Sequence, residues 1–276
     1  MFLSKSILLA VFSLTAVVLI LGLVVRLMEN RLTFFPGREL EAFPADYGLE
    51  AEEVGLRPGA SRDTLHGWYF APGAPGRPVV LICHGNAGNI SHRLEWLEPF
   101  IRRGYGALLF DYRGYGRSTG RPSEEKLAQD ATAAYDFLVR DKGVSPRSLI
   151  LFGRSIGAAP VVRLAIERPC GKIVLEGAFT NGRDMARKVF GLLPLHYFMK
   201  YRWDISGRIG KVRVPVLIIH GTRDRVVPFE LGRRLAEAGN AELVSFWAVE
   251  GGDHLDAYAL LGGRYYDRIE AFIEGQ

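Results

Sequence analysis

A serine, an aspartate and a histidine in the second half of the chain have the side chains that nucleophilic catalysis needs. Ser155 lies in the run Gly153–Gly157, which reads G-x-S-x-G and directly follows an apolar segment. A serine on such a strand-to-helix turn is held in a strained backbone conformation, and the flanking glycines avoid collisions in the turn. Because this turn holds the hydroxyl over the end of the sheet, we predict that Ser155 is the nucleophile.

Asp224 and His254 follow the serine in the chain order serine, acid, histidine. Each comes just past a predicted strand, Val214–Gly221 for the aspartate and Ala241–Ala248 for the histidine. The carboxyl ends of parallel strands share one edge of a sheet, so the three side chains can meet there. We expect His254 to be the general base and Asp224 to hold its imidazole in the reactive tautomer.

Two other carboxylates compete with Asp224 for the role of the acid. Glu176 ends the neighbouring predicted strand, and Asp253 adjoins the histidine. Asp224 is preferred because its turn directly follows a strongly apolar strand, whereas Asp253 is expected to shape its own loop.

A tetrahedral intermediate also needs backbone amide donors. One donor is expected from Ile156, the residue after the nucleophile. The other is expected from the glycine-rich loop His84–Asn89, where we assign the amide of Asn86, with Ala87 as the alternative. His84 itself is expected to brace this loop.

The elements that must position these residues follow from hydrophobic patterning. Short apolar runs without alternation predict parallel strands buried on both faces. These runs are Val79–Cys83, Ala107–Phe110, Leu149–Phe152, Ile173–Leu175 and Val216–Ile219. Helices are predicted over Ser91–Arg103, Ser123–Arg140, Ile156–Arg168, Phe229–Ala238 and Asp256–Ile273. Together with an antiparallel edge hairpin, Glu52–Leu56 and Thr64–Phe70, and the strand before the histidine, this pattern predicts an α/β fold. Its mostly parallel, eight-stranded sheet has helices on both faces.

The N-terminus carries the run Ile7–Val25, which has 19 residues and no charge. A helix needs ~20 such residues to cross a bilayer. A cleaved signal peptide is the alternative, but its apolar region is typically ~7–15 residues long, and no clear small-residue cleavage site follows. We expect an uncleaved membrane anchor over residues 1–30 and one folded domain over residues 31–276. Basic residues after the run favour the cytoplasmic side for that domain.

Residues 177–211 separate two predicted strands by more chain than one crossover helix needs, and they are rich in aromatic and basic side chains. In this architecture the segment lies over the catalytic edge as a small cap. It would either form a wall for an apolar substrate group and lean toward the membrane, or pack as an ordinary helix with a solvated basic face.

Composition excludes several other classes of protein. The net charge is only +5, and the basic residues form no long block, so no nucleic-acid partner is expected. There is no cysteine and histidine cluster that suggests a metal, and the expected chemistry needs no cofactor. The two cysteines, Cys83 and Cys170, are expected to lie too far apart for a disulfide.

Four motifs together resemble those of the abhydrolase-domain serine hydrolases, most closely the single-pass, membrane-anchored branch. They are His84–Asn89, Asp111–Gly116, Gly153–Gly157 and Gly221–Pro228. The similarity covers about Glu52 to Ile273 and implies the α/β-hydrolase fold with a Ser–Asp–His triad. Members include lysophospholipases and protein depalmitoylases, with prolyl-oligopeptidase-like peptidases as more distant relatives. Fold alone does not fix the substrate.

The expectation is therefore an enzyme that cleaves ester or thioester bonds of small acyl or lipid-like substrates at a membrane. A serine peptidase or amidase is the nearest alternative. A non-catalytic binding protein built on the same fold is the other.

Overall fold

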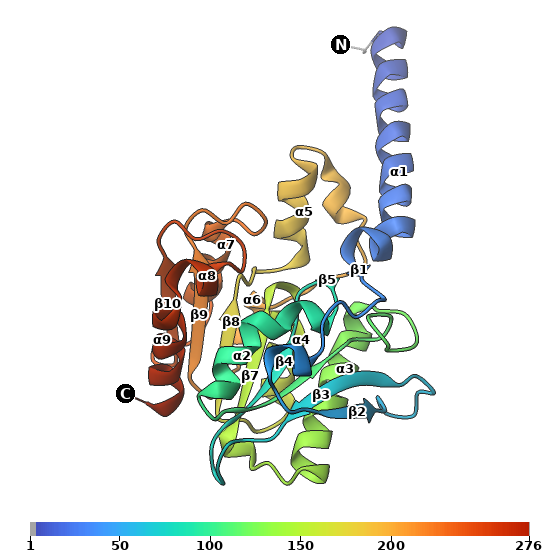
Figure 1. Cartoon of the computed structure of the whole chain (residues 1–276). Coiled ribbons are helices and arrows are strands. Elements are labelled where there is room, and N and C mark those ends of the chain that lie inside the picture. The colour runs from blue at the N-terminus through green and yellow to red at the C-terminus, as the bar shows by residue number, and fades with distance from the viewer. Residues whose placement is uncertain (1–3, 276) are drawn as a thin grey trace.

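The computed structural model describes residues 4–275, and its central feature is a twisted sheet between two layers of helices (Figure 1). The strands are β1 Phe35–Pro36, β2 Glu52–Leu56, β3 Leu65–Phe70, β4 Val79–Cys83, β5 Ala87–Gly88, β6 Gly106–Phe110, β7 Leu149–Arg154, β8 Lys172–Glu176, β9 Val216–Gly221 and β10 Val244–Val249. The helices are α1 Lys5–Thr33, α2 Leu94–Arg102, α3 Glu124–Asp136, α4 Ala158–Glu167, α5 Gly182–Phe190, α6 Ser206–Ile209, α7 Phe229–Glu237, α8 Ala257–Leu261 and α9 Gly263–Glu274.

The main sheet has eight strands in the order β10-β9-β8-β7-β4-β6-β3-β2. The six strands from β10 to β6 are parallel, and β3 and β2 add to them in antiparallel fashion at one edge. This confirms the predicted mostly parallel sheet and its edge hairpin. The carboxyl ends of β4, β7, β9 and β10 therefore share one edge, and the predicted site residues follow these four strands.

The core has two halves because each central strand sends alternate side chains to opposite faces. Along β4, Val79, Leu81 and Cys83 pack toward α3, α4 and α7, while Val80 and Ile82 pack toward α2 and α9. Every residue of β4 is buried, which explains why its sequence is apolar without alternation. Cys83 and Cys170 are buried free thiols.

Helix boundaries differ from the predicted ones where the backbone turns. The last predicted helix, Asp256–Ile273, is in fact two helices, α8 and α9. They are separated at Gly262, which has φ 54° and donates its amide to the Tyr258 carbonyl at 2.9 Å. A backbone with positive φ ends a helix and is adopted most readily by glycine.

The helix α1 extends the chain well beyond the sheet, and Figure 1 shows it rising from the body beside the turn that follows α5. It is long and apolar enough to cross a membrane. Most of its side chains are exposed, but Gly22, Val25 and Glu29 are buried against the rest of the chain. The helix ends at Thr33, three residues beyond the predicted end of the anchor.

Candidate active site

Ser155 stands on a sharp turn between β7 and α4, and its backbone has φ 53°, an uncommon conformation for a residue with a side chain. The glycines on both sides are sterically required. A methyl group on Gly157 would lie 2.0 Å from the carbonyl oxygen of Cys83, and one on Gly153 would lie 2.7 Å from the Cα of Ala158. The strained turn and its tight glycines confirm the local geometry expected from the motif.

Asp224 and His254 are in direct contact beyond the ends of β9 and β10. The imidazole Nδ1 and the carboxylate Oδ2 are 2.7 Å apart, and the other carboxylate oxygen accepts the amides of Val226 and Val227 at 2.8 and 2.7 Å. Burial alone would raise the pKa of Asp224, but hydrogen bonds from His220 and His254 outweigh it and hold that pKa below its usual range. The carboxylate is therefore ionised at neutral pH, as an orienting acid requires.

Ser155 lies beside the loop that carries the histidine. A methyl group on Gly85 would lie 3.8 Å from Ser155 Cβ and 3.8 Å from Leu255 Cδ1, and Leu255 directly follows His254. Between residues 4 and 275 the structure records no hydrogen bond that joins Ser155 to His254 themselves. Catalytic hydrogen bonds of this kind commonly tighten only when substrate is bound.

The competing carboxylates have other partners. Glu176 is buried and accepts hydrogen bonds from Arg154 Nε at 2.8 Å and from the Tyr265 hydroxyl at 3.1 Å. Arg154 also donates to the carbonyl of Leu255 at 2.9 Å, which ties the carboxyl end of β7 to the histidine loop. Asp253 accepts the amide of Arg225 at 2.9 Å and pairs with its guanidinium, so it shapes the loop as expected.

Of the two predicted amide donors, Ile156 directly follows Ser155, and Asn86 lines the same cavity as Ser155. The amide of Ile156 is in the first turn of the helical segment, where amides have no partner within the helix. The carbonyl of Asn86 accepts the Phe35 amide at 2.9 Å and the Tyr115 hydroxyl at 2.8 Å. Its side-chain amide donates to the carbonyl of Thr33 at 2.9 Å. The loop is thus fixed through its carbonyl and side chain, which leaves its backbone N–H outside these bonds.

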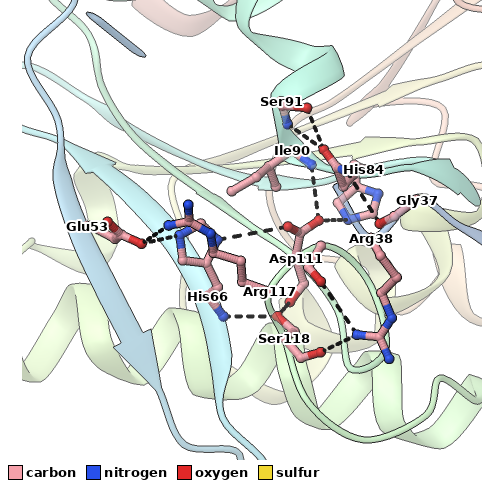
Figure 2. A network of polar contacts seen from close by, with 12 residues as sticks. Gly37, Arg38, Glu53, His66, His84, Ile90, Ser91, Asp111, Arg117 and Ser118 are labelled. Atoms are coloured by element: carbon pink, nitrogen blue, oxygen red, sulfur yellow. Dashed lines mark hydrogen bonds and ion pairs between the residues drawn. The ribbon is translucent and has the colours of Figure 1, made fainter. Parts of the chain in front are cut away.

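A buried polar network supports this loop from below, and Figure 2 shows Asp111 between two histidines. Asp111 accepts the amide of Ile90 at 3.0 Å and lies 3.7 Å from His84 Nε2 and 4.0 Å from His66 Nδ1. His84 Nδ1 is 2.7 Å from the Gly85 carbonyl, so His84 braces the loop. Burial lowers the pKa of His84 to about 3, and burial also raises the pKa of Asp111.

A cavity of about 300 Å³ opens above Ser155, Ile156 and Asn86. Its walls come from α5, from the turn after Asp224 and from the last turns of α1. The apolar side chains that line it are Val25, Leu32, Phe179, Met185, Ala186, Val189, Phe190, Met199, Trp203, Val226 and Val227. A larger surface hollow of about 800 Å³ lies between the β2–β3 turn and α3, and none of the predicted site residues lines it.

Sequence patterns missed three contributors to the site. His220 at the end of β9 lies 3.3 Å from Asp224, Arg154 holds the histidine loop, and α1 supplies a wall of the cavity. A histidine at the carboxyl end of a strand, directly before a glycine, was the available signal for the first. No local sequence pattern indicated the contact of Arg154 with the histidine loop or the part of the cavity wall that α1 supplies.

Comparison with known proteins identifies the chain as a hydrolase. The family described as "Serine aminopeptidase, S33" matches residues 74–203, which include Ser155 but end before Asp224 and His254. The chain is 37% identical over 252 residues to an uncharacterized protein of Mycobacterium tuberculosis strain H37Rv, covering 89% of this chain and 87% of that one. It is 35% identical over 227 residues to alpha/beta hydrolase domain-containing protein 17C of Xenopus tropicalis, covering 82% of this chain and 71% of that protein. The chain therefore belongs to the alpha/beta hydrolase family.

Solved structures show the same fold. The esterase Pf2001 of Pyrococcus furiosus superimposes with a TM-score of 0.73 at 23% identity, covering 87% of this chain and 98% of that chain. The esterase of Exiguobacterium antarcticum gives a TM-score of 0.62 at 17% identity, covering 81% of this chain and all of the other. At these identities the likeness establishes the architecture, and the reaction must be argued from the site.

Proposed function

We propose that this chain is a membrane-anchored serine hydrolase that cleaves carboxylic ester or thioester bonds of acyl substrates through an acyl-enzyme. The observation that carries the proposal is the hydrogen bond between His254 and Asp224. The loop that carries His254 lies beside Ser155, and Ser155 lines an apolar cavity. A histidine oriented in this way is a general base for a neighbouring hydroxyl.

The reaction would proceed in two halves. Ser155 Oγ attacks the substrate carbonyl carbon while its proton passes to His254 Nε2, and the amides of Ile156 and Asn86 bind the oxyanion. The intermediate then collapses, the leaving group takes the proton from His254, and an acyl-serine remains. Water next attacks the acyl carbon with His254 as base, which releases the carboxylic acid and restores the serine hydroxyl.

The cavity supports an apolar acyl group. Its volume of about 300 Å³ is at the lower end of the ~300–1,000 Å³ that ligand pockets occupy. At ~30 Å³ for each water-sized group, it has room for about ten such groups. A substrate with one acyl chain of about ten carbons therefore fits this space better than a substrate with two acyl chains.

A peptidase or amidase is the second candidate because the matching family is described as a serine aminopeptidase. An aminopeptidase must bind the charged amine of its substrate, which calls for a free carboxylate. Glu29 lines the cavity, but its two oxygens accept the amides of Lys200 and Tyr201. This arrangement favours an uncharged acyl chain over a substrate with a free amine.

Membrane attachment is supported by the boundary at the end of the apolar run. Arg26 follows that run and lines a hollow of about 710 Å³ together with basic side chains of the cap segment, Arg183, Arg187, Lys200 and Arg202. Basic residues at the end of a membrane helix favour the polar surface of the bilayer. The cap would then lie at the membrane surface.

A chain-length panel tests the proposal. The full chain in detergent micelles is assayed with nitrophenyl acetate, octanoate, decanoate and palmitate, with decanoyl thioester, and with aminoacyl amides. We expect the highest kcat/KM for esters near the decanoate, and a loss of at least ~10³-fold in Ser155→Ala. A preference for the amides would replace the esterase assignment. Activity that survives in Ser155→Ala would refute the mechanism.

A further inference from the structure

We infer that the last turns of α1 form a specificity-determining wall of the acyl site, so that the bound acyl chain lies between the membrane helix and α5. This inference rests on the proposed function and adds to it the place of the acyl chain. Ser155 and Leu32, although 123 positions apart in the chain, line the same cavity. A helix that served only to tether the domain would have no reason to reach the reacting serine.

The contact between α1 and the cap is built from specific interactions. Glu29 is only 2% exposed, and its two carboxylate oxygens accept the backbone amides of Lys200 and Tyr201 at 2.8 and 2.7 Å. Burying a carboxylate is costly unless it is hydrogen-bonded, and here both oxygens are satisfied. This clamp fixes the rotation of α1 about its axis relative to the cap.

One and two helical turns before Glu29, the same face of α1 also packs closely against the rest of the chain. A methyl group on Gly22 would lie 2.4 Å from the ring of Phe198, so the ring packs directly on the helix backbone. Val25, one turn further along, is buried and lines the cavity. Because residues 22, 25 and 29 recur at helical spacing, one stripe of α1 faces the cap while its other faces remain exposed.

The end of α1 also contacts the loop that would bind the oxyanion. Asn86 donates its side-chain amide to the Thr33 carbonyl at 2.9 Å and accepts the Phe35 amide at 2.9 Å. The parallel pairing of β1 with β5 continues this connection. The membrane helix therefore borders both the acyl cavity and the predicted amide donor.

The tip of the cap, like α1, projects away from the sheet (Figure 1). The cap tip carries exposed apolar side chains at Val189, Leu192, Leu193 and Tyr197, and Figure 1 shows this turn directed the same way as α1. An exposed apolar tip beside a membrane helix is suited to the apolar layer of a bilayer. An acyl chain in that layer could pass between α1 and α5 without crossing water.

A matched pair of substitutions on α1 tests the wall. Leu32 lines the cavity and is 50% exposed, whereas Leu27 is 74% exposed and lies outside the cavity lining. Both side chains are exposed at the helix surface, so we expect Leu32→Trp and Leu27→Trp to fold alike. The full chain in micelles is assayed with nitrophenyl decanoate and nitrophenyl acetate, and fluorophosphonate labelling counts the active serines.

We expect the decanoate-to-acetate ratio of kcat/KM to fall about tenfold in Leu32→Trp, as for a pocket that loses room for part of a chain, and to stay within twofold in Leu27→Trp. The inference would be wrong if the decanoate-to-acetate ratio of kcat/KM were equal in both variants and in the unchanged chain. Failure of the proposed function is a separate result, because Ser155→Ala would then keep its activity whatever the ratios are.

Discussion

The assignment of the acid can be tested by replacing Asp224 with asparagine. The carboxamide oxygen can keep the two amides of the turn, but its NH₂ group would face His254 Nδ1, which now lies 2.7 Å from a carboxylate oxygen. The imidazole must then accept at Nδ1 and carry its proton on Nε2, where it cannot take the proton of Ser155. A triad in the wrong tautomer loses ~10⁴ in kcat, about 5.4 kcal/mol of transition-state stabilisation.

The control is Glu176→Gln, which alters the other candidate acid. Glu176 accepts hydrogen bonds from Arg154 and Tyr265 and not from the histidine, so kcat per folded protein should change by less than about tenfold. Its thermal stability should fall, because removing one partner of a buried ion pair costs up to ~3–5 kcal/mol. The assay is decanoate hydrolysis normalised by the concentration of folded protein, because fluorophosphonate labelling itself requires an activated serine. A 10⁴-fold loss in Glu176→Gln, with Asp224→Asn nearly active, would show that the acid is wrongly assigned.

Three further outcomes follow from contacts around the site. Gly157→Ala should lower the free energy of unfolding by more than about 2 kcal/mol, because its Cβ would meet the Cys83 carbonyl. The control is Gly263→Ala, whose added methyl group meets nothing within 4 Å. In denaturant titrations the control should change the free energy of unfolding by less than about 1 kcal/mol. Burial lowers the pKa of His84 in the folded chain to about 3, whereas in the unfolded chain it is ~6.5. Between these two pH values only the unfolded chain binds a proton at His84. Stability should therefore fall as pH drops from 7 to 4.5, by up to ~3 kcal/mol, and His84→Asn should flatten that slope; an unchanged slope would contradict the buried neutral histidine. Glu29→Gln should speed hydrogen exchange of the backbone amides of Lys200 and Tyr201 about ten- to hundredfold, since each charge-assisted bond contributes ~1.5–3 kcal/mol. Unchanged exchange would show that these two hydrogen bonds to Glu29 do not form.

The parts of the fold that could be predicted are those with local signals. Continuous apolar runs mark the buried parallel strands, and Asn86, Ser155 and Asp224 each follow one of them, so their shared sheet edge could be inferred without coordinates. The strand before His254 is only partly buried, and its place in the chain indicated it. The sequence analysis predicted one helix at the end of the chain, whereas the structure has two. The hydrophobic pattern continues across the glycine pair at 262 and 263, so the break between the helices was overlooked. Periodicity is set by which faces are buried, and α8 and α9 bury side chains in the same half of the core.

The role of α1 could not be predicted because its contacts are distant in sequence. Glu29 meets Lys200 and Tyr201 across more than 170 positions. A glutamate just past an apolar run ordinarily marks the return to water, so its burial has no local signal.

The distribution of α1 contacts separates stability from specificity. Of the described residues, none from α1 belongs to the two core clusters that pack on the sheet, and the first residue in them is Phe34, directly after the helix. Yet α1 supplies Val25, Glu29 and Leu32 to the cavity above Ser155. A segment that contributes little to the core but lines the substrate cavity affects which acyl chain is bound far more than whether the domain folds. In the proposed enzyme α1 would therefore be part of the substrate site, and the side chains of its buried stripe, together with α5, would set the chain-length preference.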